Sequence, residues 1–162
     1  MKKVYVLLAV LCIAAQSGEA VSMTNMEIKK ALIMAISLEE GVPPEFAVAI
    51  ALTENWTLNP RAVSPPNRNG TRDWGLMQLN DAYFPLSNWY CAETNARTAI
   101  RHIRWLMDHP RTCTFWSVAV AYNAGIKRLN RPPNSTLTYA ENVMRKFNEL
   151  SGGRAPVLIG RH

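Results

Sequence analysis

The sequence predicts a mainly α-helical protein with one small β-hairpin. Two observations carry this prediction. Apolar residues recur at helical spacing in five segments, and an Asn-Gly pair typical of a tight hairpin turn lies between the second and third of them. The sequence has no internal repeat and no sign of a second domain. We therefore expect a single domain over residues 21–150, which is long enough to bury its own core.

The first residues have the pattern of a secretory signal. Lys2 and Lys3 form a positive start, residues 4–15 form an apolar run, and Gly-Glu-Ala at residues 18–20 offers a small-x-small cleavage site. The apolar run is shorter than the roughly 20 residues that a membrane-spanning helix needs. We therefore expect residues 1–20 to be removed, leaving a periplasmic or secreted protein.

The chain is basic, with a formal net charge of +6. Residues 1–20 contribute two lysines and one glutamate, so the remaining chain carries +5. A basic exported protein can be attracted to anionic wall polymers or membrane surfaces, although the charge can equally be an ordinary solvated surface. No cluster of Lys and Arg alternates with aromatic residues, so a nucleic-acid partner is not expected. Residues 151–162, with Gly-Gly and two arginines, are expected to form a flexible basic tail.

The first two helices are predicted from their ends. Thr24 and Glu27 form a capping-box pattern, and the apolar repeat after them stops at Gly41. Two prolines then break the chain, and residues 45–54 form a nearly all-apolar helix that belongs in the core. The apolar repeat of the first helix consists of Ile28, Ala31, Leu32, Ala35 and Leu38.

A hairpin and three more helices follow. The hairpin turn is predicted at residues 67–71, and we expect Thr138 with Glu141 to form a second capping box that opens the last helix. Ala99, Ile103 and Leu106 should point inward from the third helix. The predicted helices are residues 95–108, 114–124 and 138–150.

Cys91 and Cys113 remain once the leader is removed. An even number of cysteines in an oxidising compartment predicts that they pair in a disulfide, which would stabilise the fold by roughly 3 kcal/mol in the chain-entropy model. The alternative is two buried thiols.

Glu54 is the strongest candidate for chemistry, because it is an ionisable residue that ends a hydrophobic helix. Desolvation at such a position, and the negative end of the helix dipole, would both raise its pKa. A carboxylic acid that is protonated near neutral pH can donate its proton to a glycosidic oxygen. The alternative is a glutamate that ends the helix in solvent.

Three ordered motifs accompany Glu54. They are Asn-Pro-Arg-Ala-Val-Ser at residues 59–64, Gly-Leu-Met-Gln-Leu-Asn at residues 75–80 and Ala-Tyr-Asn-Ala-Gly at residues 121–125. With Glu54 they resemble the motifs of the soluble lytic transglycosylases, and the resemblance runs from about residue 32 to residue 147. The chain is most similar in style to the small transglycosylases associated with secretion systems and virulence. The resemblance implies a lysozyme-like fold and a cleft that binds peptidoglycan glycan strands.

The resemblance also implies the reaction. Glu54 would act as the single catalytic acid and base, cleaving the β-1,4 bond between N-acetylmuramic acid and N-acetylglucosamine and leaving 1,6-anhydromuramic acid ends. Tyr139 would hydrogen-bond near the catalytic carboxylate, unless it is an ordinary core tyrosine. No cofactor is implied. The family usually has serine directly after its catalytic glutamate, whereas Asn55 stands there in this chain.

Five further residues align with positions that bind substrate in the family. Ser64 would orient the muramic acid, and Met77 and Gln78 would line the sugar groove. Tyr122 and Asn123 would lie opposite the catalytic residue and hold the N-acetyl group of the substrate.

Asp73 determines the reaction class. The segment from residue 73 to residue 80 also resembles the second-carboxylate segment of animal lysozymes. If Asp73 flanks the scissile bond opposite Glu54, the pair fits hydrolysis by a muramidase. If Asp73 only bonds nearby backbone in the hairpin, Glu54 acts alone. An alternative of another class is a noncatalytic peptidoglycan-binding module.

The remaining candidates are weaker. His102 and His109 are seven residues apart with no accompanying ligand pattern, so no metal site is predicted. Most of the tryptophans are expected in the core, while Trp74 and Trp89 could stack on sugar rings. We expect a monomer that acts on glycan strands, and the resemblance to secretion-associated transglycosylases implies a cell-envelope secretion apparatus as a further partner.

Overall fold

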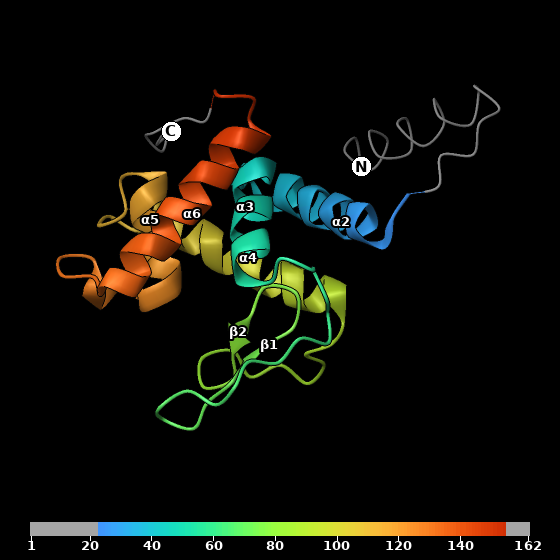
Figure 1. Ribbon diagram of the computed structural model, residues 1–162, viewed down its shortest axis with the longest axis horizontal. Coiled ribbons are helices and arrows are strands. Elements are labelled where there is room, and N and C mark those ends of the chain that lie inside the picture. The colour runs from blue at the N-terminus through green and yellow to red at the C-terminus, as the bar shows by residue number, and fades with distance from the viewer. Residues whose placement is uncertain (1–22, 155–162) are drawn as a thin grey trace.

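The computed structural model describes residues 23–154 and confirms the mainly α-helical prediction (Figure 1). Within this range, five α-helices and a short 3₁₀ helix accompany a two-stranded sheet. The predicted leader over residues 1–20, and the tail from residue 155 onward, lie outside the described residues. No helix between residues 23 and 154 has the length and apolar character to cross a membrane. The elements in order are α2 (Asn25–Glu40), α3 (Pro44–Glu54), β1 (Asp73–Trp74), β2 (Leu79–Asn80), α4 (Ala92–Asp108), α5 (Phe115–Ala124), the 3₁₀ helix η1 (Ile126–Arg128) and α6 (Asn134–Leu150).

Helix α3 forms the centre of the core, as its nearly all-apolar sequence predicts. It packs between α2 and α6, and α5 packs against α6 (Figure 1). Every residue from Phe46 to Ala51 is buried. Phe46, Phe115 and Phe147 bring three helices together, with ring centroids 4.8 to 5.2 Å apart at tilted or edge-on angles. Because α3 is buried along most of its length, its C-terminal residue is held in a fixed position.

The ends of α2 are as predicted, but its buried face is not. The capping box of Thr24 and Glu27 is present, and Gly41 ends the helix in the left-handed region at φ 71°. Ile28 and Leu38, however, are each 53% exposed, because α2 lies at the surface against α3 and α4. Only one side of α2 meets these neighbours, and it buries Ile33, Ile36 and Ser37.

Two helices begin earlier than predicted. Helix α4 begins at Ala92, and α6 begins at Asn134, directly after a proline. The predicted capping box at Thr138 is therefore wrong, since the Thr138 hydroxyl donates instead to the Asn134 carbonyl at 3.2 Å, one turn earlier in the same helix. The inward positions predicted for α4, Ala99, Ile103 and Leu106, are all buried.

The predicted disulfide between Cys91 and Cys113 is absent from the described residues. Cys91 is the N-cap of α4, whereas Cys113 follows the C-terminal end of that helix. The 17 residues of α4 rise about 25 Å. A disulfide needs its Cα atoms within about 7 Å, and the few residues after α4 cannot bring the chain back that far.

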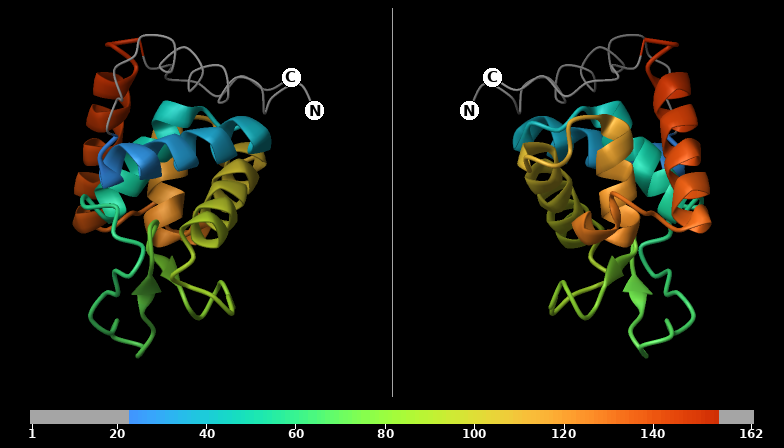
Figure 2. Two further views of the ribbon diagram at one scale, coloured as in Figure 1. Left: turned by 90° about the vertical axis from the view of Figure 1, so that its right-hand side faces the viewer. Right: turned by 90° about the vertical axis from the view of Figure 1, so that its left-hand side faces the viewer.

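The sheet is small and lies at one end of the helical body (Figure 2). Strand β1 pairs antiparallel with β2, and Val63 forms an isolated bridge to Trp74 on the other side. The predicted turn at residues 67–71 is present, where the Asn67 N–H donates to the Thr71 carbonyl at 2.7 Å. A second tight turn at residues 75–78 joins β1 to β2. The chain between α3 and α4, residues 55–91, is called the β segment below, and it projects from the helices beside the C-terminal end of α3.

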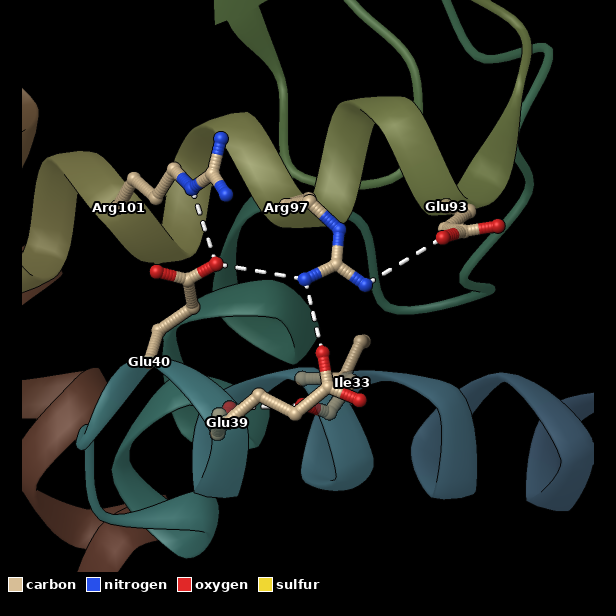
Figure 3. Close-up of polar contacts among 7 residues, drawn as sticks. Ile33, Glu39, Glu40, Glu93, Arg97 and Arg101 are labelled. Atoms are coloured by element: carbon tan, nitrogen blue, oxygen red, sulfur yellow. Dashed lines mark hydrogen bonds and ion pairs between the residues drawn. The ribbon is translucent and has the colours of Figure 1, made fainter. Parts of the chain in front are cut away.

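Ion pairs join α2 to α4 (Figure 3). Arg97 contacts Glu39 at 2.8 Å and Glu40 at 3.3 Å, and Arg101 contacts Glu40 at 2.9 Å. Arg97 also contacts Glu93 one turn earlier, at 3.3 Å. Arg97 and Glu40 are partly covered, whereas Glu39, Glu93 and Arg101 are exposed, so each pair contributes on the order of 1 kcal/mol and together the pairs help to fix the orientation of the two helices.

Candidate active site

A cleft of about 980 Å³ lies between the helical body and the β segment. Its helical side comes from the C-terminal end of α3, the second half of α4 and the end of α5. Its other side comes from β1, β2 and the turn at residue 67. Five of the sequence-predicted site residues meet here: Glu54, Asp73, Gln78, Tyr122 and Asn123.

Glu54 is the last residue of α3, is half-buried and lines this cleft. Burial raises its pKa from 4.5 to about 7, and the negative charge of Asp73 acts in the same direction. Hydrogen bonding from Tyr139 acts in the opposite direction and offsets part of this rise. With a pKa of about 7, Glu54 can hold its proton near neutral pH and can also lose it there.

Asn55, which stands where serine is usual, connects the end of α3 to the β segment. It is 8% exposed, and its amide nitrogen donates to the Asn59 carbonyl at 2.8 Å and to the Gly75 carbonyl at 3.4 Å. Its amide oxygen accepts from the Thr57 hydroxyl at 2.8 Å. The residue next to Glu54 thus satisfies buried carbonyls from two loops and fixes where the helix ends relative to the cleft.

Asp73 lies on β1 and lines the cleft, and three side chains donate to its carboxylate. The donors are Asn80 at 2.8 Å, Asn67 at 3.3 Å and the Ser64 hydroxyl at 3.4 Å. Its charge acts on Glu54, as the pKa of that residue shows. Asp73 therefore bonds side chains of the hairpin and also lines the cleft together with Glu54.

Ser64 and Met77 do not line the cleft. The Ser64 hydroxyl accepts from the Asp73 backbone N–H at 2.9 Å and shares its single proton between the Pro65 carbonyl at 2.9 Å and the Asp73 carboxylate at 3.4 Å. The Met77 side chain is fully buried, and its backbone carbonyl accepts from the Tyr122 hydroxyl at 2.9 Å. Both residues contact the cleft indirectly, through Asp73 and Tyr122.

Gln78, by contrast, lines the cleft and has an unusual backbone. It adopts φ 49°, a left-handed conformation that is uncommon for a residue with a side chain. Its side-chain amide nitrogen donates to the Gly75 carbonyl at 2.9 Å. This turn residue is thereby held in one orientation.

Two residues missed by the sequence reasoning, Gly75 and Asn95, hold that turn in place. Gly75 has φ 78°, and a Cβ atom there would lie 2.4 Å from the Asn95 amide nitrogen and 2.7 Å from the Trp89 carbonyl. Asn95 of α4 is fully buried, donates to the Trp74 carbonyl at 2.9 Å and accepts from the Met77 N–H at 2.8 Å. The sequence held a signal for Asn95, because this polar residue lies four residues before Ala99 and so falls on the apolar side of the helix.

Three residues of α5 and α6 complete the surroundings of Glu54. The Asn123 amide oxygen accepts from the Thr136 hydroxyl at 2.8 Å, which orients the Asn123 side chain at the cleft. The hydroxyl of Tyr139 is buried and has no hydrogen-bond partner of ordinary geometry among the described residues, yet it is near enough to lower the pKa of Glu54. Burial, followed by the charge of Glu54, raises the pKa values of both Tyr122 and Tyr139 well above 10, so both hydroxyls remain protonated donors.

The sugar-facing aromatic residues differ from those expected. Trp74 donates its ring N–H to Asp81 at 3.1 Å and packs on Trp89 with centroids 6.0 Å apart, and neither ring lines the cleft. The aromatic residues that do line it, besides Tyr122, are Tyr83, Phe84, His102 and Trp105. Their positions depend on how the β segment meets α4, which local sequence does not reveal.

Among residues 23–154 no group of three His, Cys, Asp or Glu residues is placed to hold a metal ion.

Comparison with known proteins gives one match. The family model described as "Transglycosylase SLT domain" matches residues 31–144. No curated protein and no solved structure gives a significant match. The matched range begins in α2 and ends in α6, and it includes every residue named in the cleft.

Proposed function

The chain belongs to the SLT transglycosylase family, whose members act on peptidoglycan, and we propose that it is a lytic transglycosylase with Glu54 as catalytic acid and base. The mainly α fold with its small sheet is the lysozyme-like fold of this family. The proposed reaction cleaves the β-1,4 bond between N-acetylmuramic acid and N-acetylglucosamine. The observation that carries this proposal is the placement of Glu54 at the end of a buried helix, where it lines a cleft large enough for sugar rings and burial raises its pKa to about 7.

In the first step, protonated Glu54 donates its proton to the glycosidic oxygen. The bond between the muramic acid C1 and that oxygen breaks, its electron pair stays with the oxygen, and N-acetylglucosamine departs as the alcohol. The positive charge that forms at C1 is shared with the ring oxygen or with the carbonyl of the neighbouring N-acetyl group. Ionised Glu54 remains beneath it.

In the second step, Glu54 accepts the proton of the muramic acid 6-hydroxyl. The oxygen of that hydroxyl attacks C1 and closes the 1,6-anhydro ring, and no water is consumed. Glu54 ends the cycle protonated, as it began. The attack is favoured because the nucleophile belongs to the same sugar, which gives it a large effective concentration.

A pKa near the working pH suits a residue that must first give and then take a proton. An exposed glutamate with a pKa of about 4.3 would hold its proton in fewer than about one in a hundred molecules at neutral pH. The packing of α3, which places the carboxyl group at the end of a buried helix, therefore supports the chemistry directly.

For substrate binding we propose roles for the residues around Glu54. Gln78, Tyr122 and Asn123 contact the sugars, with Asn123 directed at the N-acetyl group. Ser64 and Met77 do not contact the sugars themselves. They hold Asp73 and Tyr122 in place through hydrogen bonds. Tyr139 orients the Glu54 carboxyl.

A second candidate is a muramidase that hydrolyses the same bond. Asp73 favours it, because its carboxylate lines the same cleft and its charge acts on Glu54. In that reaction water replaces the 6-hydroxyl, and the product carries a reducing end instead of an anhydro end.

Mass spectrometry of digested peptidoglycan separates these reactions. The transglycosylase proposal expects anhydromuramyl ends from the wild-type protein and no digestion by the Glu54→Gln variant. Glu45→Gln, at the other end of the same helix, is the matched control and should digest normally. Reducing ends in place of anhydro ends would establish the muramidase, and a wild-type protein that binds peptidoglycan without cutting it would establish a binding module.

We also propose that the protein acts as a monomer outside the cytoplasm, after removal of residues 1–20, in the periplasm or after secretion. Because the sequence resembles secretion-associated transglycosylases, we also propose that the protein cleaves peptidoglycan together with a cell-envelope secretion apparatus. N-terminal sequencing of the exported protein checks the leader, because a mature chain that begins near residue 21 is expected.

A further inference from the structure

The cleft is lined by two strongly exposed aromatic residues. Trp105 is 55% exposed and Tyr83 is 75% exposed, and both line the cleft with Glu54. Trp105 lies in the second half of α4, whereas Tyr83 lies in the loop after β2. Two parts of the chain that are distant in sequence therefore present open aromatic rings to the same hollow.

Trp105 is held in place although its ring is open. Its ring stacks on His102 with centroids 5.6 Å apart and an interplanar angle of 17°, and it meets His109 at 5.5 Å. His102 in turn packs edge-on against Phe84 at 5.1 Å and contacts Tyr122 at 5.8 Å. A chain of ring contacts thus runs from Trp105 to Tyr122, which borders Glu54.

His102 serves as an uncharged support in this stack. It is half-buried, and burial lowers its pKa, so the imidazole is neutral at neutral pH. A neutral ring stacks on Trp105 without introducing a charge beneath it. The orientation of Trp105 is therefore fixed before any ligand arrives, which reduces the entropy lost on binding.

The surroundings of Trp105 are those of a site for a sugar ring. A pyranose has an apolar face of C–H groups and a rim of hydroxyl and amide groups. The cleft offers open aromatic faces together with polar side chains that include Gln78, Asn80 and Lys127. Apolar and aromatic surface combined with a few polar groups is the usual composition of small-molecule sites.

We propose that Trp105 and Tyr83 form an outer saccharide subsite, which stacks on a sugar ring of the glycan strand beyond the two that flank the scissile bond. This inference rests on the proposed function, because it takes the bound strand to lie along the cleft. The subsite lengthens the segment of strand that the protein binds, so it makes long strands better ligands than short fragments.

Binding measurements in the inactive Glu54→Gln background test the subsite separately from the reaction. The ligands are N-acetylglucosamine oligomers of two and six sugars, measured by isothermal titration calorimetry. Trp105→Ala should weaken hexamer binding about tenfold, or about 1.4 kcal/mol, and change dimer binding by less than about twofold. Tyr83→Ala should also weaken hexamer binding, and Trp105→Phe, which keeps an aromatic face, should restore most of the lost affinity.

Trp56→Ala is the matched control. Trp56 is 75% exposed but does not line the cleft, so its loss should leave binding of both oligomers unchanged. Equal hexamer affinity in Trp105→Ala and its parent would overturn the subsite, and so would an equal loss for dimer and hexamer. Either result would leave the exposed ring as a contact for a protein partner.

A second measurement does not depend on the stability of the Trp105→Ala variant. In the Glu54→Gln protein the indole N–H resonance of Trp105, assigned by its loss in Trp105→Phe, should shift during hexamer titration while that of Trp56 stays fixed. An unshifted Trp105 resonance at saturation would refute the proposal. If wild-type protein made no anhydro ends while Trp105 still responded, the reaction assignment would fail and the subsite would stand.

Discussion

Replacing Asp73 by asparagine removes one negative charge from the cleft while it keeps a side chain of nearly the same shape. Asp73 accepts hydrogen bonds from Asn80, Asn67 and the Ser64 hydroxyl. The asparagine carbonyl oxygen can retain the shortest of these bonds. The charge of Asp73 raises the pKa of Glu54, so its removal should lower that pKa.

The expected fall in the pKa of Glu54 is small, because Asp73 contributes less to that pKa than burial does. The pKa of Glu54 rises from 4.5 to about 7, and burial is the largest cause while Asp73 is the smallest. Asparagine at position 73 leaves the burial intact. We therefore expect the pKa of Glu54 to fall by less than about one unit, equivalent to less than about 1.4 kcal/mol.

The assay is the pH dependence of kcat/KM for peptidoglycan digestion. The first step needs protonated Glu54, so activity falls on the alkaline side as pH passes the pKa of the free enzyme, and that limb should move to lower pH in the variant. Asp108→Asn is the control, because it removes the same charge from an exposed residue of α4 outside the cleft.

Two outcomes would refute this reasoning. An alkaline limb that stays in place or moves to higher pH would show that Asp73 does not tune Glu54. A loss of activity of more than about a hundredfold at every pH would give Asp73 a direct part in the reaction and favour hydrolysis.

Three further predictions concern stability. The pKa of Glu54 is higher in the folded than in the unfolded state, so the folded state binds more protons between pH 4.5 and about 7, and the free energy of unfolding falls as pH rises through that window. The Glu54→Gln variant lacks this effect. It should therefore be more stable than the wild type by up to about 3 kcal/mol at pH 8 and by little at pH 4, as measured by urea unfolding. Gly75→Ala should cost at least about 2 kcal/mol in the same assay, since φ is 78° and Asn95 and the Trp89 carbonyl occupy the space of the new Cβ, and an unchanged midpoint would contradict the close packing. Dithiothreitol should leave Tm unchanged because no disulfide joins Cys91 to Cys113, and a reductant-dependent Tm would show that a bond forms.

Features determined by local sequence were predicted well. Residues 46–52 form an unbroken apolar run, which predicted a buried helix, and Glu54 stood out as the charge at its end. The ends of α2 followed from Thr24 and Gly41, whose capping chemistry acts within one turn.

Features determined by tertiary packing were predicted poorly. Ile28 and Leu38 belong to the apolar repeat of α2 but lie outside the arc that α3 and α4 cover. The exposure of Trp105 depends on where the β segment meets α4, and no local pattern specifies that meeting. The cysteine prediction failed for a simpler reason, because the helix expected between Cys91 and Cys113 was itself long enough to keep them apart.

The position of Glu54 relative to the β segment depends on two buried asparagines. Asn55 ties the end of α3 to the Asn59 and Gly75 carbonyls, and Asn95 ties α4 to the backbone of Trp74 and Met77. Both therefore hold the same short turn, one from each side. Hydrophobic packing alone would let a small sheet slide on the helical body, because apolar contacts are not directional. Buried hydrogen bonds are directional and costly to break, so these two amides fix the width of the cleft in which the glutamate must work.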